Sequence, residues 1–199
     1  MSVVNRIAII GSATSGGALQ IIDALQGNDE QKVVALFDSD LSLKGKKILG
    51  AEMLDSSDNI LPYFEQGLFD SAIIGVGGNL NERERIFQQL VSLKIPLTNI
   101  IDKTTQVRSG VKIGSGNVIL GGAYIGPNVT IGDNCYVLNN ISIQHDSIIG
   151  HHCYLSTGSI IGAHVKVGNK VRFEILSGAK SKISIEDNKV VAAGVILSI

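Results

Sequence analysis

A six-residue repeat runs without interruption from Val111 to the end of the chain. Written in sixes, the segment begins VKIGSG, NVILGG, AYIGPN, VTIGDN, CYVLNN and ISIQHD. The third position of nearly every block is aliphatic, with Phe173 and Ala179 as exceptions, and the fourth is often glycine. Because side chains alternate along a strand, the first and third positions share one face, and glycine or Asn supplies the following turn.

This period predicts a parallel β-helix. A single block cannot bury its apolar face, so three blocks close a triangular coil and successive coils stack around one interior. The period alone does not fix the handedness. Residues one coil apart become neighbours, which places Cys135 beside Cys153. We interpret them as two small core thiols, with a redox pair as the alternative.

Residues 1–104 have a different pattern, in which apolar strands alternate with helices. This order predicts a parallel sheet of a Rossmann-like α/β domain, followed by the all-β domain over residues 105–199. The expected strands are residues 7–10, 33–37, 71–78 and 97–101.

Two helices are expected between these strands. The first has Leu19, Ile22 and Leu25 on one face. The second begins at Asn81, with Glu84 as the capping-box partner, and ends before Pro96.

Ligands bind parallel sheets at the carboxyl ends of the strands, where glycine loops and acidic residues gather here. Backbone N–H groups before the first helix favour a pyrophosphate, and carboxylates accept hydrogen bonds from a base or ribose. A tight turn before a helix is the alternative interpretation. The candidate sugar-nucleotide contacts are Gly11, Ser15, Gly16, Asp38, Ser39, Asp40, Gly77 and Asn79.

Composition excludes several function classes. The net charge of −1 gives no basic excess for nucleic acid. No stretch is long enough to cross a bilayer, and no secretory signal is present, so we expect a cytoplasmic protein. Neither the histidine spacing nor a carboxylate cluster supports a zinc site, and we expect no metal. His151, His152 and His164 are expected to be solvated turn residues.

The whole chain resembles the sugar O-acyltransferase family of the sialic acid O-acetyltransferase type. Within it, the nucleotide-sugar 4-amino N-acetyltransferases, which act on UDP-, dTDP- or GDP-linked amino sugars, are the most similar. The resemblance rests on GSATSGG, LFDSD, ILGAEML, SAIIGVGGNLNERERIF, TNIID and above all ISIQHDSIIGHH. It implies a homotrimer of left-handed β-helices, with acetyl-CoA in the groove between neighbouring helices.

The family's catalytic histidine and the acidic residue after it correspond to His145 and Asp146. An amine must lose a proton as it attacks a thioester, and a neutral imidazole oriented by a carboxylate can accept that proton. Tyr154 stands where the family has a second histidine, and the first loop lacks the family's histidine. The residues expected at acetyl-CoA are Tyr154, Ala163, Ile175 and Ala193.

We therefore expect acetyl transfer from acetyl-CoA to the amino group of a nucleotide-linked sugar, as in surface glycan biosynthesis. One alternative is O-acetylation of a free sugar such as a sialic acid. Another is a non-catalytic trimer that only binds a sugar nucleotide. An NAD-dependent oxidoreductase is disfavoured, because the first loop does not have the GxGxxG spacing.

Overall fold

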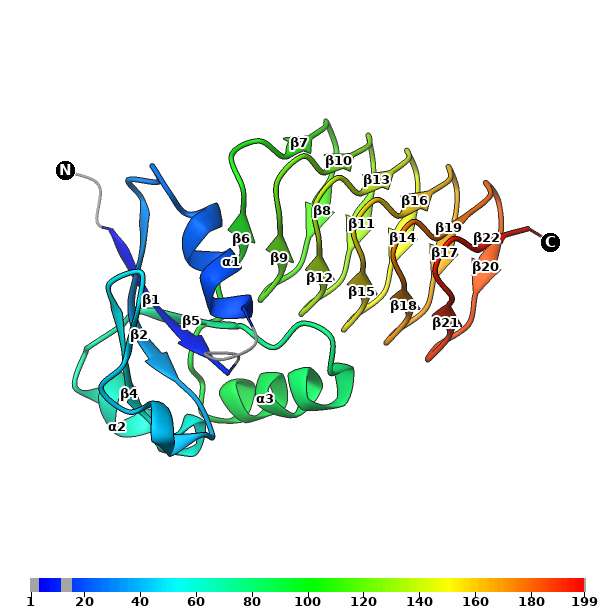
Figure 1. Ribbon diagram of the computed structural model, residues 1–199. Helices are drawn as coiled ribbons and strands as arrows, with labels where there is room; N and C mark the ends of the chain where they lie inside the picture. Colours follow the sequence, from blue (N-terminus) through cyan, green and yellow to red (C-terminus); the bar gives the residue numbers. More distant parts are fainter. Residues whose placement is uncertain (1–3, 12–15, 199) are drawn as a thin grey trace. The chain divides into compact units, whose positions relative to one another are not determined.

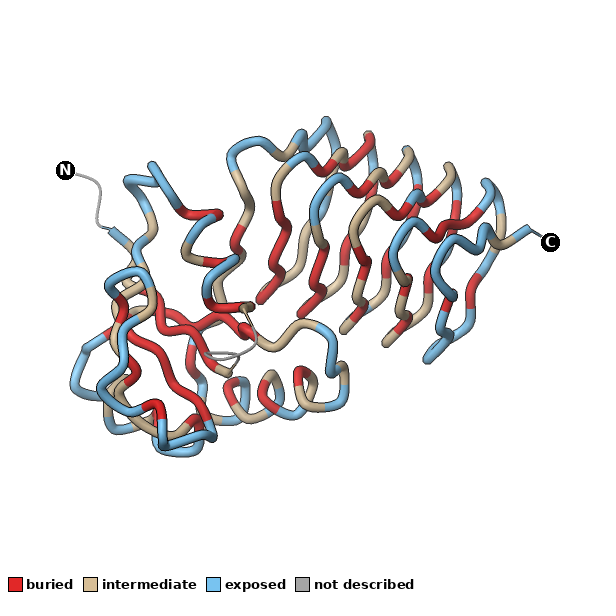
Figure 2. Tube along the Cα trace, viewed as in Figure 1, coloured by how far each residue is buried: buried red, intermediate tan, exposed pale blue. Residues whose placement is uncertain are grey.

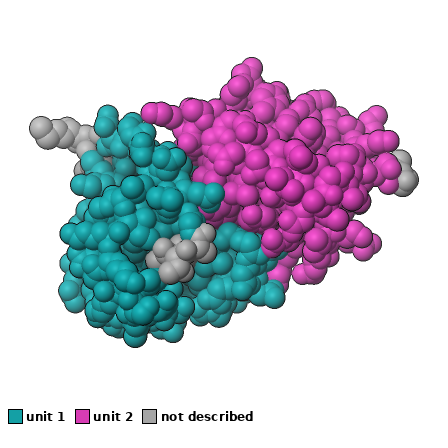
Figure 3. Space-filling model, viewed as in Figure 1, with its two compact units in different colours: residues 1–100 teal, residues 101–199 magenta. Residues whose placement is uncertain are grey.

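The structure is a computed structural model of the chain, and it describes residues 4–11 and 16–198. The chain forms two compact units, residues 1–100 and 101–199 (Figure 3). We call them the N-terminal unit and the C-terminal unit. The boundary expected from the sequence lay a few residues later, at 104/105.

The N-terminal unit contains a five-stranded sheet in the order β3-β4-β2-β1-β5 (Figure 1). Four strands are parallel and β3 pairs with β4 antiparallel. The strands are β1 (Asn5–Ile10), β2 (Gln31–Phe37), β3 (Lys47–Ile48), β4 (Ala51–Asp55) and β5 (Ser71–Ile74). The helices are α1 (Gly17–Ala24), η1 (Leu41–Leu43), η2 (Ser57–Asn59), α2 (Leu61–Glu65) and α3 (Leu80–Ser92). One face of the sheet packs against Ile86 and Leu90 of α3.

This sheet is small and mixed, and it differs from the wholly parallel Rossmann-like sheet expected. Strands β3 and β4 were not predicted from the sequence. They extend the sheet beyond β2, with β4 next to β2 and β3 at the edge. The expected strand over residues 97–101 does not join the sheet as a strand, since Leu97 makes only an isolated bridge to Ala72. The next strand, β6 (Ile100–Ile101), pairs within the C-terminal unit, because Ile101 is already in phase with the repeat.

Both predicted helices exist, but their details differ. In α1 the buried residues are Gly17, Ala18, Ile21 and Ala24, whereas Leu19 is 48% exposed. The N-cap of α3 is Asn79, whose side chain accepts a hydrogen bond from the Glu82 N–H at 3.1 Å. Asn81 lies inside the helix, so the predicted cap at Asn81 is wrong. The same Asn-x-x-Glu spacing occurs two residues earlier.

The C-terminal unit confirms the six-residue repeat: two-residue strands form three parallel sheets whose strands pair one coil apart. This arrangement fits a left-handed β-helix. The first sheet contains β7 (Gln106–Val107), β10 (Tyr124–Ile125), β13 (Ser142–Ile143), β16 (Ile160–Ile161), β19 (Gly178–Ala179) and β22 (Ile196–Leu197). The second contains β8 (Lys112–Ile113), β11 (Thr130–Ile131), β14 (Ile148–Ile149), β17 (Lys166–Val167) and β20 (Ser184–Ile185). The third contains β6, β9 (Val118–Ile119), β12 (Tyr136–Val137), β15 (Tyr154–Leu155), β18 (Arg172–Phe173) and β21 (Val190–Val191).

The first and third positions of the blocks fill the interior of the β-helix. Buried residues recur along successive coils in Figure 2. Phe173 is fully buried there, and Ala179 follows it in the neighbouring sheet. Cys135 and Cys153 are buried free thiols, in agreement with their interpretation as core residues.

Three corners connect the sheets, and their turn residues adopt positive φ angles. The first corner joins the first sheet to the second and contains Asn128, Asp146 and His164, with φ between 56° and 57°. The second corner joins the second sheet to the third and contains Asn134 and His152. The third corner leads back to the first sheet. Among the residues that the structure describes, no helix is long and apolar enough to span a membrane.

Candidate functional site

His145 and Asp146 form a hydrogen-bonded pair on the first corner. The Nδ1 atom of His145 lies 2.7 Å from Oδ2 of Asp146. Both side chains are exposed, at 50% and 39%. With Nδ1 facing the carboxylate, Nε2 of the imidazole is left to meet a substrate, which is the arrangement that a general base requires.

Asp146 is held by its neighbours in the preceding coil. Its Oδ1 accepts a hydrogen bond from Asn128 Nδ2 at 3.1 Å, and its backbone N–H donates to the Pro127 carbonyl at 3.0 Å. Hydrogen bonds from His145 and then Asn128, together with the nearby His164, lower the pKa of the Asp146 carboxyl. The carboxylate is therefore ionised and oriented at neutral pH.

His164 lies beside this pair, and it is an exposed turn residue as expected from the sequence. Its ring meets that of His145 edge to face, with 5.2 Å between centroids and 87° between planes. Its backbone N–H donates to the His145 carbonyl at 3.1 Å. The repeat could have located it, because His164 stands one coil after Asp146 at the same block position.

The residues expected at acetyl-CoA lie on different sides of the coil stack. Ala163 is on the first corner, one coil beyond His145, and its N–H donates to Ser181 Oγ at 3.0 Å. Tyr154 lies on the third sheet, where Arg172 stacks over its ring at 4.9 Å from the centroid. Ile175 and Ala193 are exposed on the third corner. One chain therefore does not bring these four residues together.

The expected nucleotide contacts follow three adjacent strands of the N-terminal sheet. Gly11 comes directly after β1, Asp38 after β2, and Gly77 shortly after β5. Gly11 has a φ of 77°, and a Cβ there would lie 2.6 Å from a methyl group of Val76. Only glycine fits this close approach.

Several of these residues also have local structural roles. The carboxylate of Asp38, a buried residue, accepts a hydrogen bond from the Asp40 N–H at 3.0 Å. Ser39 is exposed between them, and Asp40 caps η1 through the Ser42 N–H. Gly16 precedes α1 with a φ of 86°. Asn79 caps α3, and Ser15 lies outside the described residues.

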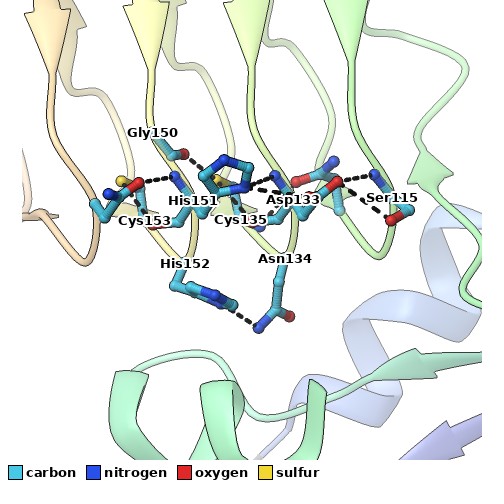
Figure 4. Close-up of polar contacts among 10 residues, drawn as sticks. Ser115, Asp133, Asn134, Cys135, Gly150, His151, His152 and Cys153 are labelled. Atoms are coloured by element: carbon cyan, nitrogen blue, oxygen red, sulfur yellow. Dashed lines mark hydrogen bonds and ion pairs between the residues drawn. The ribbon is translucent and has the colours of Figure 1, made fainter. Parts of the chain in front are cut away.

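The second corner carries two further histidines, shown in Figure 4. His151 Nδ1 accepts a hydrogen bond from the Asp133 N–H at 3.0 Å. The Asp133 carboxylate in turn accepts a hydrogen bond from the N–H of Ser115, one coil earlier. His152 Nδ1 lies 2.8 Å from Asn134 Nδ2. These side chains connect successive coils along two separate columns.

Comparisons with known proteins agree with this fold. Residues 97–199 match the family model described as the GMPPB C-terminal domain. No curated protein sequence matches the chain.

Several solved structures resemble nearly the whole chain, including the following two. A mutant GDP-perosamine N-acetyltransferase from Caulobacter crescentus, in complex with CoA and GDP-perosamine, has a TM-score of 0.89 at 22% identity, covering 100% of this chain and 90% of its own. The acetyltransferase domain of PglB from Neisseria gonorrhoeae has a TM-score of 0.70 at 17% identity, covering 96% and 93%. These matches, at 22% and 17% identity, establish the fold.

Proposed function

The chain belongs to the GMPPB C-terminal domain family through residues 97–199, and we propose that it is an acetyl-CoA-dependent N-acetyltransferase of a nucleotide-linked amino sugar. The observation that carries this proposal is the His145–Asp146 pair, at 2.7 Å, on an exposed corner of the β-helix. The fold match to an enzyme captured with CoA and GDP-perosamine supports the same chemistry.

In the proposed reaction, the sugar amine attacks the carbonyl carbon of acetyl-CoA. A C–N bond forms, the C–S bond breaks, and His145 Nε2 accepts the proton that the nitrogen loses. Asp146 holds the imidazole with Nδ1–H towards its carboxylate and stabilises the imidazolium that forms. The proton then passes to the departing thiolate, so the base is restored.

We propose that acetyl-CoA lies beside Tyr154, Ala163, Ile175 and Ala193 in a groove between copies of the chain. Ala163 is next to the first corner, whereas Tyr154, Ile175 and Ala193 lie on the third sheet and third corner. A groove between neighbouring β-helices reconciles these positions, because each copy would present a different side to it. The proposal therefore requires a homotrimer, and light scattering at micromolar protein tests it. A monomeric mass would contradict the shared groove.

For the nucleotide, we propose the carboxyl edge of the N-terminal sheet as a Rossmann-like site. Gly11, Asp38 and Gly77 lie at the ends of adjacent strands, where such sheets bind ligands. This assigns sugar-nucleotide binding to residues 1–104 and acetyl transfer to residues 105–199, in a cytoplasmic enzyme. Gly16 is the N-cap of α1, and the first N–H groups of a helix favour an anion such as a pyrophosphate.

A thiol-release assay tests the proposed reaction. The purified chain is supplied with acetyl-CoA and, separately, with UDP-, dTDP- and GDP-linked 4-amino sugars, their 4-hydroxy counterparts and a free sialic acid. We expect thiol release only with a 4-amino sugar nucleotide, with a product heavier by one acetyl group. Release with hydroxyl acceptors alone would instead indicate O-acetylation, and release with no acceptor in the panel would contradict the proposed function.

A further inference from the structure

Two corners of the β-helix each carry two histidines, but they arrange them differently. On the first corner, His145, Asp146 and His164 each offer one ligand atom, and these atoms all lie within 4.8 Å of one another. All three side chains are exposed, so a solvated cation can reach them.

The second corner provides the contrast (Figure 4). His151 Nδ1 is bonded to the Asp133 N–H and His152 Nδ1 to the Asn134 side chain, at 3.0 and 2.8 Å. These bonds place the two imidazoles in separate vertical pairs, His151 with Asp133 and His152 with Asn134. His151 Nδ1 also lies 3.2 Å from the Asp133 carboxylate, but His152 does not complete a set of three with them. Among the described residues, only His145, Asp146 and His164 form a set of three ligand atoms within 4.8 Å of one another.

The backbone fixes the gathered set. The His164 N–H donates to the His145 carbonyl at 3.1 Å, and the Asp146 N–H donates to the Pro127 carbonyl at 3.0 Å. Asn128 supports the Asp146 carboxylate from the other side at 3.1 Å, as an outer-sphere partner supports a metal ligand. The three residues are therefore held in place by their backbone, while the ligand atoms stand on exposed side chains.

The chemistry of the set favours a borderline cation. Two imidazoles and a carboxylate suit Zn²⁺, and three protein ligands leave a fourth tetrahedral position for water. Cys135 and Cys153 are buried and do not compete as exposed thiols.

We propose that His145, Asp146 and His164 form a reversible Zn²⁺ site on the first corner, and that its occupancy inhibits the enzyme. The binding follows from the three ligands alone, whereas the inhibition rests on the proposed function. A cation on either nitrogen of His145 prevents catalysis. At Nε2 it occupies the lone pair that accepts the substrate proton, and at Nδ1 it replaces the proton that is shared with the Asp146 carboxylate, so that their hydrogen bond is lost.

Isothermal titration of the untagged chain with zinc sulfate, in a buffer that does not chelate metals, tests the site. The matched variants are His164→Asn on the first corner and His152→Asn on the second. Both positions have positive φ, 56° and 58°, and Asn occupies the equivalent position at 128 and 134. Neither variant should disturb the fold, which circular dichroism checks.

We expect one Zn²⁺ per chain, with affinity weakened more than about tenfold by His164→Asn, since even outer-sphere losses cost about 10–100-fold. His152→Asn should bind as the wild type does. In the thiol-release assay, Zn²⁺ should inhibit the wild type and a chelator should restore the rate, with weaker inhibition of His164→Asn.

Absence of stoichiometric binding, or loss of binding in His152→Asn with retention in His164→Asn, would overturn the site. Binding as expected without inhibition of an active enzyme would overturn the regulatory part. Because the titration needs no turnover, an inactive protein would contradict the proposed function and leave the binding result intact.

Discussion

The imidazole Nδ1 of His145 lies 2.7 Å from the carboxylate of Asp146, its immediate neighbour in the chain. Consecutive side chains of a strand point to opposite faces, so this contact depends on the turn, where Asp146 has a φ of 57°. The corner, rather than the strands beside it, makes the pair possible.

Replacing His145 by Ala should remove nearly all acetyl transfer, because loss of a general base costs about 10²–10⁴-fold in rate. The side chain is exposed, so the fold should be unaffected. Asp146→Asn keeps a residue that tolerates positive φ and should cost less. Steady-state kinetics and circular dichroism measure both effects, and wild-type turnover by His145→Ala would rule out the mechanism.

Changing Asp38 to Asn should raise KM for the sugar nucleotide and leave KM for acetyl-CoA nearly unchanged. The amide can still accept a hydrogen bond from the Asp40 N–H, but it lacks the charge that favours a ribose or base donor. Hydrogen exchange should show nucleotide-dependent protection of residues 36–40. Protection of this segment by acetyl-CoA instead would contradict the division of labour between the two units.

Gly11→Ala should destabilise the protein more than Gly67→Ala. Both glycines have positive φ, 77° and 71°, which costs a non-glycine residue about 1–2 kcal/mol. A Cβ at Gly67 would meet no atom within 4 Å, whereas one at Gly11 would lie 2.6 Å from Val76. Urea unfolding compares the two, and equal losses would show that Val76 moves aside freely.

Ile149→Ala should cost about 2–5 kcal/mol of unfolding free energy, as for a core isoleucine. Ile148→Ala, the next residue along β14, should cost far less, because Ile148 is 45% exposed and Ile149 only 1%. Chemical denaturation measures both. Similar losses would contradict the inward and outward assignment of the repeat positions.

The ion pair between Arg6 and Asp70 should make stability depend on acid pH. Hydrogen bonding to Arg6 lowers the pKa of Asp70 in the folded state. The pair therefore contributes its full stabilisation at pH values above the ordinary Asp pKa of about 3.9, which applies to the unfolded chain. This contribution is lost as the pH falls through the lowered pKa of Asp70 in the folded state. Asp70→Asn should be less stable than wild type near neutral pH, with the difference vanishing in acid. A constant difference would contradict the linkage.

The sequence predicted the β-helix well because each block repeats the same physical requirement. Ile143 and Ile161, which are eighteen residues apart and paired in neighbouring coils, both have to fill the interior of the β-helix. The N-terminal sheet has no such repetition. Residues 51–55 mix Glu52 and Asp55 with apolar residues, and this pattern does not distinguish a strand from a loop.

The candidate site has a different origin. The resemblance to the sugar acyltransferases, rather than the repeat, pointed to the His145–Asp146 pair. His164 belongs to the next coil, and its ring meets that of His145 through a contact between coils. The Asp40 carboxylate could bind a ligand or cap a helix, and the choice depends on geometry. In the structure it caps η1. Local sequence does not distinguish those two roles.

At each corner, hydrogen bonds link successive coils by joining residues eighteen positions apart, such as Asn128 with Asp146 and Ser115 with Asp133. Within the β-helix, every eighteen residues of sequence therefore correspond to an advance of one coil along the axis. Gain or loss of a full coil would lengthen or shorten the column and leave every remaining vertical pair in place. Gain of a single residue would instead break the vertical pairs that span it, and one placed between Asn128 and Asp146 would remove the support of the aspartate beside His145.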